Sequence, residues 1–356
     1  MTTSQLTDKG GRAEELLRSY FLRNGFFVAR GVTVIFQGTE VTDIDLWLYL
    51  RASTINRIRV NVDAKNRSTP KALERILWAK GLQASLGFDQ CIVATTDKRS
   101  LAKQYGKEKG VLVLDGEFLS RLEKSGLGND RLTEEEFVDL ILSQKLDKLA
   151  GNWRGRLREA KARLVNKLEF DGCNSWLEDA RYFIEQSMVS DRQQEACRLL
   201  YLILAFFLIG LDHSSRTFVL EDGEARKKEL LDGFLYGSKG KARTEELLHV
   251  ASGLIGSYAP ELRAKGEKIK RTVLQDLGDL PADILSEYFS RKEVSTDLFS
   301  MARALEEQAY SKTFIPPGQL PGGLQGLIGV TLDFFKIDRK RFFEKSLAVQ
   351  LDLTKG

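Results

Sequence analysis

Alternating apolar and polar positions mark two neighbouring strands in the first third of the chain. Every second residue is apolar over 42–50, and residues 57–65 alternate in the same way. Side chains two positions apart on a strand point to the same face, so each segment predicts a strand with one core face and one polar face. Residues 26–36 are rich in β-branched and aromatic side chains and predict a preceding strand, with a turn at 37–40.

Helical patterns surround these strands. Apolar residues recur at helical spacing over 13–21, and Gly25 is expected to end that helix. Thr69 and Pro70 supply a capping hydroxyl and a proline at the first helical position, which predicts a helix running to about Leu86. Two short strands follow, at 91–95 and 111–114, with a helix at 98–109 between them. The predicted order is αβββαβ followed by αβ, which indicates an α/β domain.

From Thr133 onward the pattern changes to long helices. Thr133 and Glu136 make a capping box that opens a helix, and no proline occurs between Pro70 and Pro260. The preceding segment KSGLGNDR is typical of a linker. We therefore predict three parts, which are an α/β domain at 1–122, a linker at 123–132 and a mainly helical domain at 133–356.

Composition changes this picture little. The 356 residues are 42% hydrophobic and 29% charged, as in ordinary globular proteins. Cys91, Cys173 and Cys197 are far apart, which argues against a zinc ribbon or a disulfide framework and fits a reducing compartment. The N-terminus lacks a signal-peptide pattern, and the most apolar run, 199–211, is too short to span a bilayer and predicts a buried core helix. We predict a cytoplasmic protein without a membrane partner.

The formal net charge is +4, and the excess of Lys and Arg lies in the first third of the chain. This distribution favours a polyanionic partner there, although a solvated basic surface explains it as well. Four arginines are candidates for phosphate contact, although arginines at strand edges are commonly plain surface: Arg30, Arg57, Arg59 and Arg67.

Two carboxylates and a lysine meet on the polar faces of the neighbouring strands. Asp63 and Lys65 project side by side, and Asp45 lies on the polar face of the preceding strand. Carboxylate oxygens are ligands that Mg²⁺ prefers, and an ammonium can orient or acidify an attacking water. The D/E-x-K triplet recurs at 159–161 and 338–340, but only Asp63 ends a strand that follows an acid-bearing strand. The conjunction predicts a site for metal-dependent phosphodiester cleavage.

Residues 10–115 resemble the PD-(D/E)XK nuclease superfamily. The segment GRAEELLRSYFLRNGFFVAR is similar to the first helix and strand of Holliday-junction resolvases. The segments TDIDLWLYL, VNVDAKN and GLQASLG are similar to Mrr-type restriction endonucleases. The resemblance implies a restriction-endonuclease-like αβββαβ core in this α/β domain. It also implies a divalent metal, normally Mg²⁺ with Mn²⁺ as the alternative, and hydrolysis of DNA or sometimes RNA. No proline precedes the strand acid here, so Asp43 competes with Asp45 for that position.

The resemblance also implies a role for each candidate residue. Glu14 takes the place of the helix acid, Asp45 and Asp63 those of the two strand acids, and Lys65 that of the lysine. Glu14, Asp45 and Asp63 are then the metal ligands. Gln83 falls where several branches of the superfamily carry a helix glutamine, and it completes the expected catalytic set.

Each candidate also has a plainer interpretation. Asp45 alone is an exposed strand acid, Asp63 with Lys65 is an ion pair, and Gln83 is a helix residue satisfied by solvent. Glu14 lies at the edge of the core-facing stripe on a helical wheel, but an i,i+4 pair with Arg18 explains it too. The same wheel directs Glu15 to solvent.

The sequence thus predicts a Mg²⁺-dependent nuclease whose partner is nucleic acid, with DNA favoured over RNA. By analogy, such a protein suits restriction, phage defence or DNA repair. The alternative is a nuclease fold that binds nucleic acid or protein without cutting, with the helical domain as an assembly or sensor domain. That domain would recognise substrate or a protein partner, or form a homo-oligomer.

Overall fold

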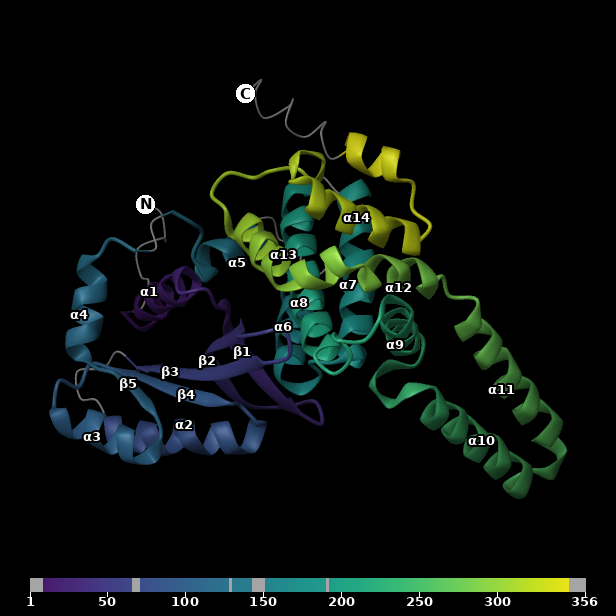
Figure 1. Ribbon diagram of the computed structural model, residues 1–356, viewed down its shortest axis with the longest axis horizontal. Coiled ribbons are helices and arrows are strands. Elements are labelled where there is room, and N and C mark those ends of the chain that lie inside the picture. The colour runs from purple at the N-terminus through teal and green to yellow at the C-terminus, as the bar shows by residue number, and fades with distance from the viewer. Residues whose placement is uncertain (1–8, 66–70, 128–129, 143–150, 190–191, 346–356) are drawn as a thin grey trace. The chain divides into compact units, whose positions relative to one another are not determined.

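The computed structural model describes residues 9–65, 71–127, 130–142, 151–189 and 192–345 (Figure 1). The chain divides into two compact units. Unit 1 comprises Met1–Asn166 with Ala302–Phe314, and unit 2 comprises Lys167–Met301 with Ile315–Gly356. The predicted helix start at Thr69 and Pro70, and Arg67, lie outside the described residues.

Unit 1 is built on a mixed five-stranded sheet in the order β1-β2-β3-β4-β5. The first three strands are antiparallel neighbours, whereas β3, β4 and β5 run parallel. The adjacent antiparallel strands predicted at 42–50 and 57–65 are confirmed by the pairing of β2 with β3. The strands are β1 (Phe27–Phe36), β2 (Thr39–Arg51), β3 (Arg57–Lys65), β4 (Gln90–Thr95) and β5 (Leu112–Leu114).

Helices cover both faces of this sheet (Figure 1). Leu17 and Phe21 of α1 share a core with α4 and with the even-numbered residues of β2 and β3. Ile76 and Ala79 of α2 pack with Cys91 and Val93 on the opposite face. The helices of unit 1 are α1 (Lys9–Arg23), α2 (Ala72–Leu86), α3 (Ser100–Lys109), α4 (Gly116–Lys124), α5 (Glu134–Leu142) and α6 (Trp153–Asn166).

Local sequence signals explain several element ends. Gly25 follows α1 with a φ of +90°, and Gly38 turns β1 into β2 with a φ of +80°, a region that glycine enters without strain. The predicted capping box at the start of α5 is confirmed. The Thr133 hydroxyl accepts from the Glu136 N–H at 3.1 Å, and the Glu136 carboxylate accepts from the Thr133 N–H at 2.8 Å.

The segment between α4 and α5 is tied to the rest of unit 1. Arg131 forms an isolated antiparallel bridge with Ser311, and the Leu132 N–H donates to the Tyr310 carbonyl at 2.8 Å. Residues 302–314 therefore belong to the α/β unit although they are far from it in sequence.

Unit 2 is helical, which confirms the expectation of an N-terminal α/β region followed by a mainly helical one. Its helix α8 (Gln193–Ser215) confirms the predicted core helix, because every residue from 196 to 215 is buried. Among the described residues, α8 is the one helix long and apolar enough to cross a membrane, and its apolar window is wholly buried. Cys91, Cys173 and Cys197 are buried free thiols.

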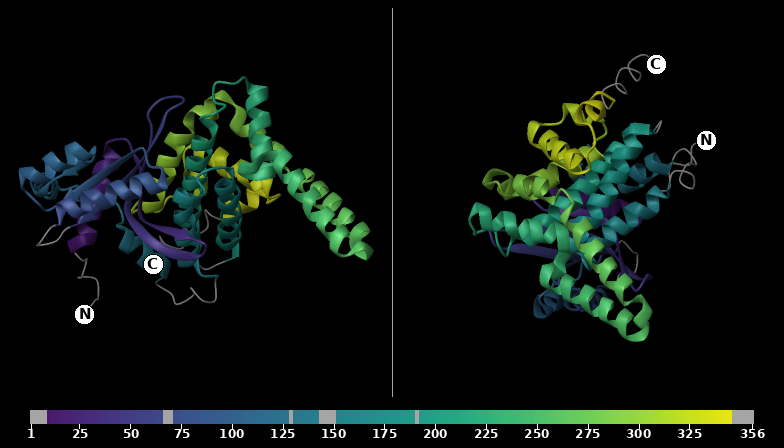
Figure 2. Two further views of the ribbon diagram at one scale, coloured as in Figure 1. Left: turned by 90° about the horizontal axis from the view of Figure 1, so that it is seen from below. Right: turned by 90° about the vertical axis from the view of Figure 1, so that its right-hand side faces the viewer.

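The remaining helices of unit 2 follow in chain order. Helices α10 and α11 pack side by side as a hairpin (Figure 2), and α13 begins in unit 2 and ends in unit 1. These helices are α7 (Phe170–Val189), α9 (Gly223–Tyr236), α10 (Gly240–Tyr258), α11 (Arg263–Gly278), α12 (Ala282–Ser290), α13 (Lys292–Tyr310) and α14 (Gly322–Phe334), with the short 3₁₀ turns η1 (Gly237–Lys239), η2 (Pro260–Leu262) and η3 (Pro317–Gln319).

Candidate active site

Asp45 and Lys65 meet where β3 ends. The Lys65 ammonium donates to the Asp45 carboxylate at 3.1 and 3.3 Å, and the N–H of Ala64 donates to the same carboxylate at 2.7 Å. The Asp45 side chain is 14% exposed and that of Lys65 is 33% exposed. The strand register explains this contact. Leu46 lies opposite Val62, so the next position toward the end of β3 sets Asp45 opposite Asp63, which is two residues before Lys65 on the same strand. The Lys65 ammonium is thus paired with a carboxylate, and the side chain remains partly exposed to solvent.

Asp63 lies beside them on β3 but is held by a different cation. Its buried carboxylate accepts two hydrogen bonds from the Arg75 guanidinium, and the one from Nε measures 2.7 Å. Arg75 lies in the first turn of α2, the helix that follows β3 in the chain. A planar guanidinium matches a carboxylate with two parallel hydrogen bonds, so this pair is well directed. The sequence interpretation did not include Arg75.

Glu14 reaches the same region from α1. Its carboxylate accepts a hydrogen bond from Arg30 Nε at 2.8 Å. Burial raises the pKa of Glu14 above its ordinary value, the hydrogen bond and charge of Arg30 oppose this, and the charge of Asp45 raises the pKa further, against a lowering by Lys65. Burial therefore disfavours the charged form of the Glu14 carboxylate, while Arg30 favours it.

Asp45 is the common electrostatic neighbour of this group. It acts on the pKa of Glu14, and it also opposes the lowering of the Arg75 pKa that burial causes. Asp43, the competing candidate, is exposed on the same strand and lies opposite Thr33 of β1. The geometry therefore selects Asp45 rather than Asp43 as the partner of Lys65.

Gln83 does not lie with these residues. Its side chain donates to the Asp89 carbonyl at 2.9 Å and accepts from the Lys80 ammonium at 2.9 Å, next to the start of β4. Helix α2 begins near the end of β3 and runs back along the sheet, so Gln83 is about 12 Å further along the helix axis than Arg75. Gln83 faces the sheet at the opposite end from Lys65, and it is therefore not part of the constellation.

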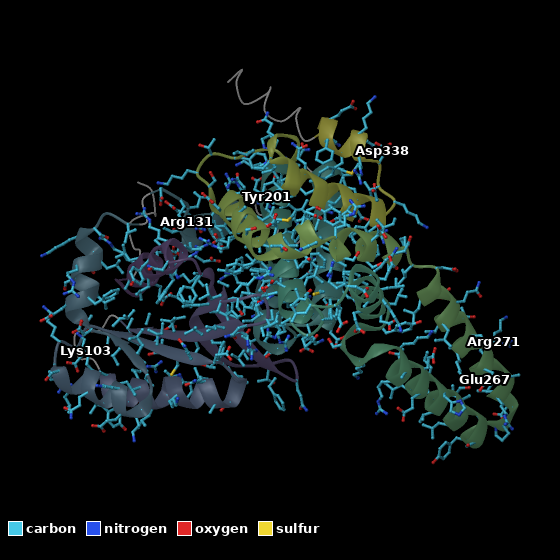
Figure 3. The ribbon with its side chains drawn as sticks, in the orientation of Figure 1. Lys103, Arg131, Tyr201, Glu267, Arg271 and Asp338 are labelled. Atoms are coloured by element: carbon cyan, nitrogen blue, oxygen red, sulfur yellow. The ribbon has the colours of Figure 1, made fainter. Side chains whose placement is uncertain are left out.

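A buried ionic network supports α1 behind Glu14. Arg18 does not pair with Glu14, as the plainer interpretation had it, but donates to Glu306 at 2.8 Å. Glu15 was expected to face solvent and is instead buried, because its carboxylate accepts from Arg30 at 2.8 Å and from the Glu134 N–H at 3.0 Å. Members of this network are Glu15, Arg18, Arg30, Arg131 (labelled in Figure 3), Glu134, Lys161 and Glu306.

The other predicted phosphate contacts are occupied within the fold. Arg57 is buried and donates to the carbonyls of Ser53 and Thr54 at 2.7 and 2.9 Å. Arg59 donates to the Gly87 carbonyl at 2.5 Å. Both arginines stand toward the first residues of β3, away from Asp63 and Lys65 at its end. They hold loops in place at that end of the sheet.

The oxygen atoms of the three candidate carboxylates match the ligands that a divalent metal prefers. Glu14, Asp45 and Asp63 offer only hard oxygen atoms, which suits Mg²⁺ or Mn²⁺. Within the described ranges, however, no group of three or more His, Cys, Asp and Glu side chains is close enough to hold an ion as it stands. Two of these carboxylates are instead paired with arginines, Glu14 with Arg30 and Asp63 with Arg75. The residue types fit the ion, but to bind it Asp63 would have to give up its hydrogen bonds to Arg75.

Comparison with known proteins adds no relative. No protein-family model matches the chain, and neither a curated protein nor a solved structure matches it significantly.

Proposed function

We propose that unit 1 is a metal-dependent nuclease of the PD-(D/E)XK type that hydrolyses phosphodiester bonds, in DNA by preference. One observation carries the proposal. Asp45 on β2 meets Lys65 at the end of β3, while Asp63 stands two residues before that lysine and Glu14 comes from the first helix. Three carboxylates and one lysine thus come from three elements, α1, β2 and β3, and this supports the set of residues that the sequence resemblance implies.

Each side chain has a role that its surroundings support. Asp45, Asp63 and Glu14 would hold the divalent ion, which when bound stabilises charge on the phosphate and lowers the pKa of a water. Lys65 is partly exposed and hydrogen-bonded to Asp45, so its ammonium is fixed in direction and can orient a water or assist its proton transfer. Arg30 fixes Glu14 through a hydrogen bond of 2.8 Å.

Cleavage by the purified full-length protein, with and without Mg²⁺, tests the proposal. The substrates are labelled single-stranded, double-stranded and branched DNA and a matching RNA. Asp63→Asn and Asp45→Asn should abolish cleavage, because each removes a charged ligand. Lys65→Ala removes no ligand, so it should retain metal binding and depress turnover by about 10²-fold or more if the lysine assists proton transfer.

Asp43→Asn is the matched control for Asp45→Asn. It removes the same charge from an exposed position on the same strand, so it should keep most of the cleavage activity. Undiminished cleavage in EDTA, or equal activity in the wild type and the Asp45, Asp63 and Lys65 variants, contradicts the assignment of the site.

A second candidate is a nuclease fold that binds without cutting. One observation favours it: each of the three carboxylates is paired with a cation of the chain itself, namely Lys65, Arg75 or Arg30. A binding module has no need to release these pairs. The two candidates separate on metal titration, because only the nuclease requires Mg²⁺ to bind at Asp63 and to release Arg75 from it.

A further inference from the structure

Helix α2 carries an exposed aromatic side chain beside the candidate site. Trp78 is 46% exposed, whereas Trp47, Trp153 and Trp176 are fully buried. These are all four tryptophans of the chain. Leu77, the residue before it, is 56% exposed as well. The two side chains form a small apolar surface on the outer side of a helix whose inner side packs on the sheet.

Arg75 connects Trp78 to the candidate site. Its guanidinium carbon lies 5.9 Å from the centre of the Trp78 ring, and the same guanidinium holds the Asp63 carboxylate. Residues three apart on a helix are neighbours on its surface. A single side chain therefore separates the exposed ring from the carboxylate at the candidate site. The Arg75 side chain is itself 27% exposed, so its guanidinium can exchange partners without crossing the core.

The chemistry of this pair matches one nucleotide. An indole face binds the flat face of a base, and a guanidinium binds a phosphate with two parallel hydrogen bonds. We propose that Trp78 and Arg75 form a docking edge for a nucleic-acid strand with an unpaired base, in which Trp78 stacks on the base and Arg75 passes from Asp63 to a phosphate. The proposal rests on the proposed function, because a nuclease site at Asp63 would bring a nucleic-acid strand next to Arg75 and Trp78.

The docking edge narrows the substrate class. In a duplex both faces of an internal base are covered by its neighbours, so a side-chain ring stacks only on a base that is terminal, flipped out or single-stranded. We therefore expect single-stranded DNA, or a DNA with unpaired nucleotides at the cut, to bind better than a blunt duplex. The stack adds affinity through any base, because every base has a flat face.

Fluorescence of the full-length protein tests the docking edge directly. Trp78 is the one exposed tryptophan of the four, so quenching of the exposed indole by a stacked base reports on this side chain. The probes are oligodeoxythymidine and a blunt hairpin duplex, titrated in EDTA so that no cleavage occurs. Trp78→Phe identifies the signal of Trp78 and keeps an aromatic face, and labelled DNA supplies the affinity of each variant.

The expected results are specific to this side chain. Oligodeoxythymidine should quench the Trp78 signal, and Trp78→Ala should weaken its binding by about 5- to 150-fold, since one stacked base contributes roughly 1–3 kcal/mol. Trp78→Phe should restore part of that loss. Leu77→Ala is the matched control, an exposed apolar residue on the same helix, and it should bind as the wild type does. Arg75→Met should weaken binding and reduce its salt dependence by about one phosphate contact.

Other outcomes overturn the docking edge. They are an unquenched Trp78, no binding of oligodeoxythymidine, an equal loss in Leu77→Ala, or an equal loss of duplex binding. The proposed function fails separately, through the absence of Mg²⁺-dependent cleavage. If cleavage requires Asp63 but is unchanged in Trp78→Ala, the docking edge is refuted and the proposed function stands. Quenching and binding without any cleavage leave the docking edge standing on a non-cleaving module.

Discussion

Replacing Arg75 with methionine should raise the affinity of the protein for Mg²⁺ or Mn²⁺. The methionine keeps an apolar stem of similar length on α2 but removes the charge and every donor that now holds Asp63. In the wild type an incoming ion must first displace the guanidinium from Asp63. In the variant the carboxylate has no competing cation, so the ion meets a ligand that is free to turn.

The size of the effect follows from the pair itself. Asp63 is 7% exposed and Arg75 is 27% exposed at the side chain, so solvent screens their two hydrogen bonds only in part. A hydrogen bond to a charged group contributes about 1.5–3 kcal/mol net. If the pair as a whole contributes this amount, the dissociation constant of the ion should fall by about 10- to 150-fold.

Isothermal titration calorimetry of both proteins measures this constant. The titration is best run at about pH 8, because loss of a cationic partner raises the pKa of a buried carboxyl and a proton would then compete with the ion. Circular dichroism first establishes that the variant is folded. Arg59→Met is the matched control, since Arg59 lies on the same strand as Asp63 but binds the Gly87 carbonyl. An unchanged constant in Arg75→Met, or an equal gain in Arg59→Met, refutes the reasoning.

Two further predictions concern the charges around the site. Glu14→Gln should raise the thermal stability of the metal-free protein at neutral pH and weaken metal binding. The raised pKa of Glu14 means that, above the unfolded pKa, folding disfavours the charged carboxylate. A lower melting temperature of the variant would contradict this. Burial alone would raise the pKa of Glu134, but the charges of Lys161 and Arg18 lower it to about 2. Its contribution to stability is therefore present above the unfolded pKa of 4.5 and lost as the pH falls toward 2, so urea unfolding in Glu134→Gln should depend less on pH over that window.

The strands and their acids could be predicted because their signals are local. Even-numbered residues of β2 and β3 share one core with α1, so the face that meets α1 needs an apolar residue at every second position, and a one-residue shift would turn Asp45 and Asp63 toward α1. The same alternation sets Asp63 and Lys65 two positions apart on one strand. The capping box at Thr133 is equally local, since its two hydrogen bonds span three residues.

The partners of the site residues could not be predicted because they come from distant segments. A helical wheel directed Glu15 outward, but α5 brings the Glu134 N–H to its carboxylate across 119 positions. Arg18 likewise pairs with Glu306, 288 positions away. Arg75 carried a weak local signal. The small residues Ala72 and Ala79 lie on the side of α2 that is buried, and Arg75 lies between them on the helix surface, so its side chain starts from the side that faces the sheet.

The pairing of Asp63 with Arg75 makes metal and substrate mutually dependent under these proposals. A cation that takes Asp63 frees the guanidinium for a phosphate, and a phosphate that takes the guanidinium frees Asp63 for the cation. Linkage requires the two effects to be equal in free energy, so the metal ion raises the affinity for the nucleic acid by the same factor by which the nucleic acid raises the affinity for the ion. Arg75→Met abolishes this factor, and it changes the two affinities in opposite directions, tighter for the ion and weaker for the strand. A mere structural ion pair gives no reason for that opposition, since its loss would loosen α2 and weaken both.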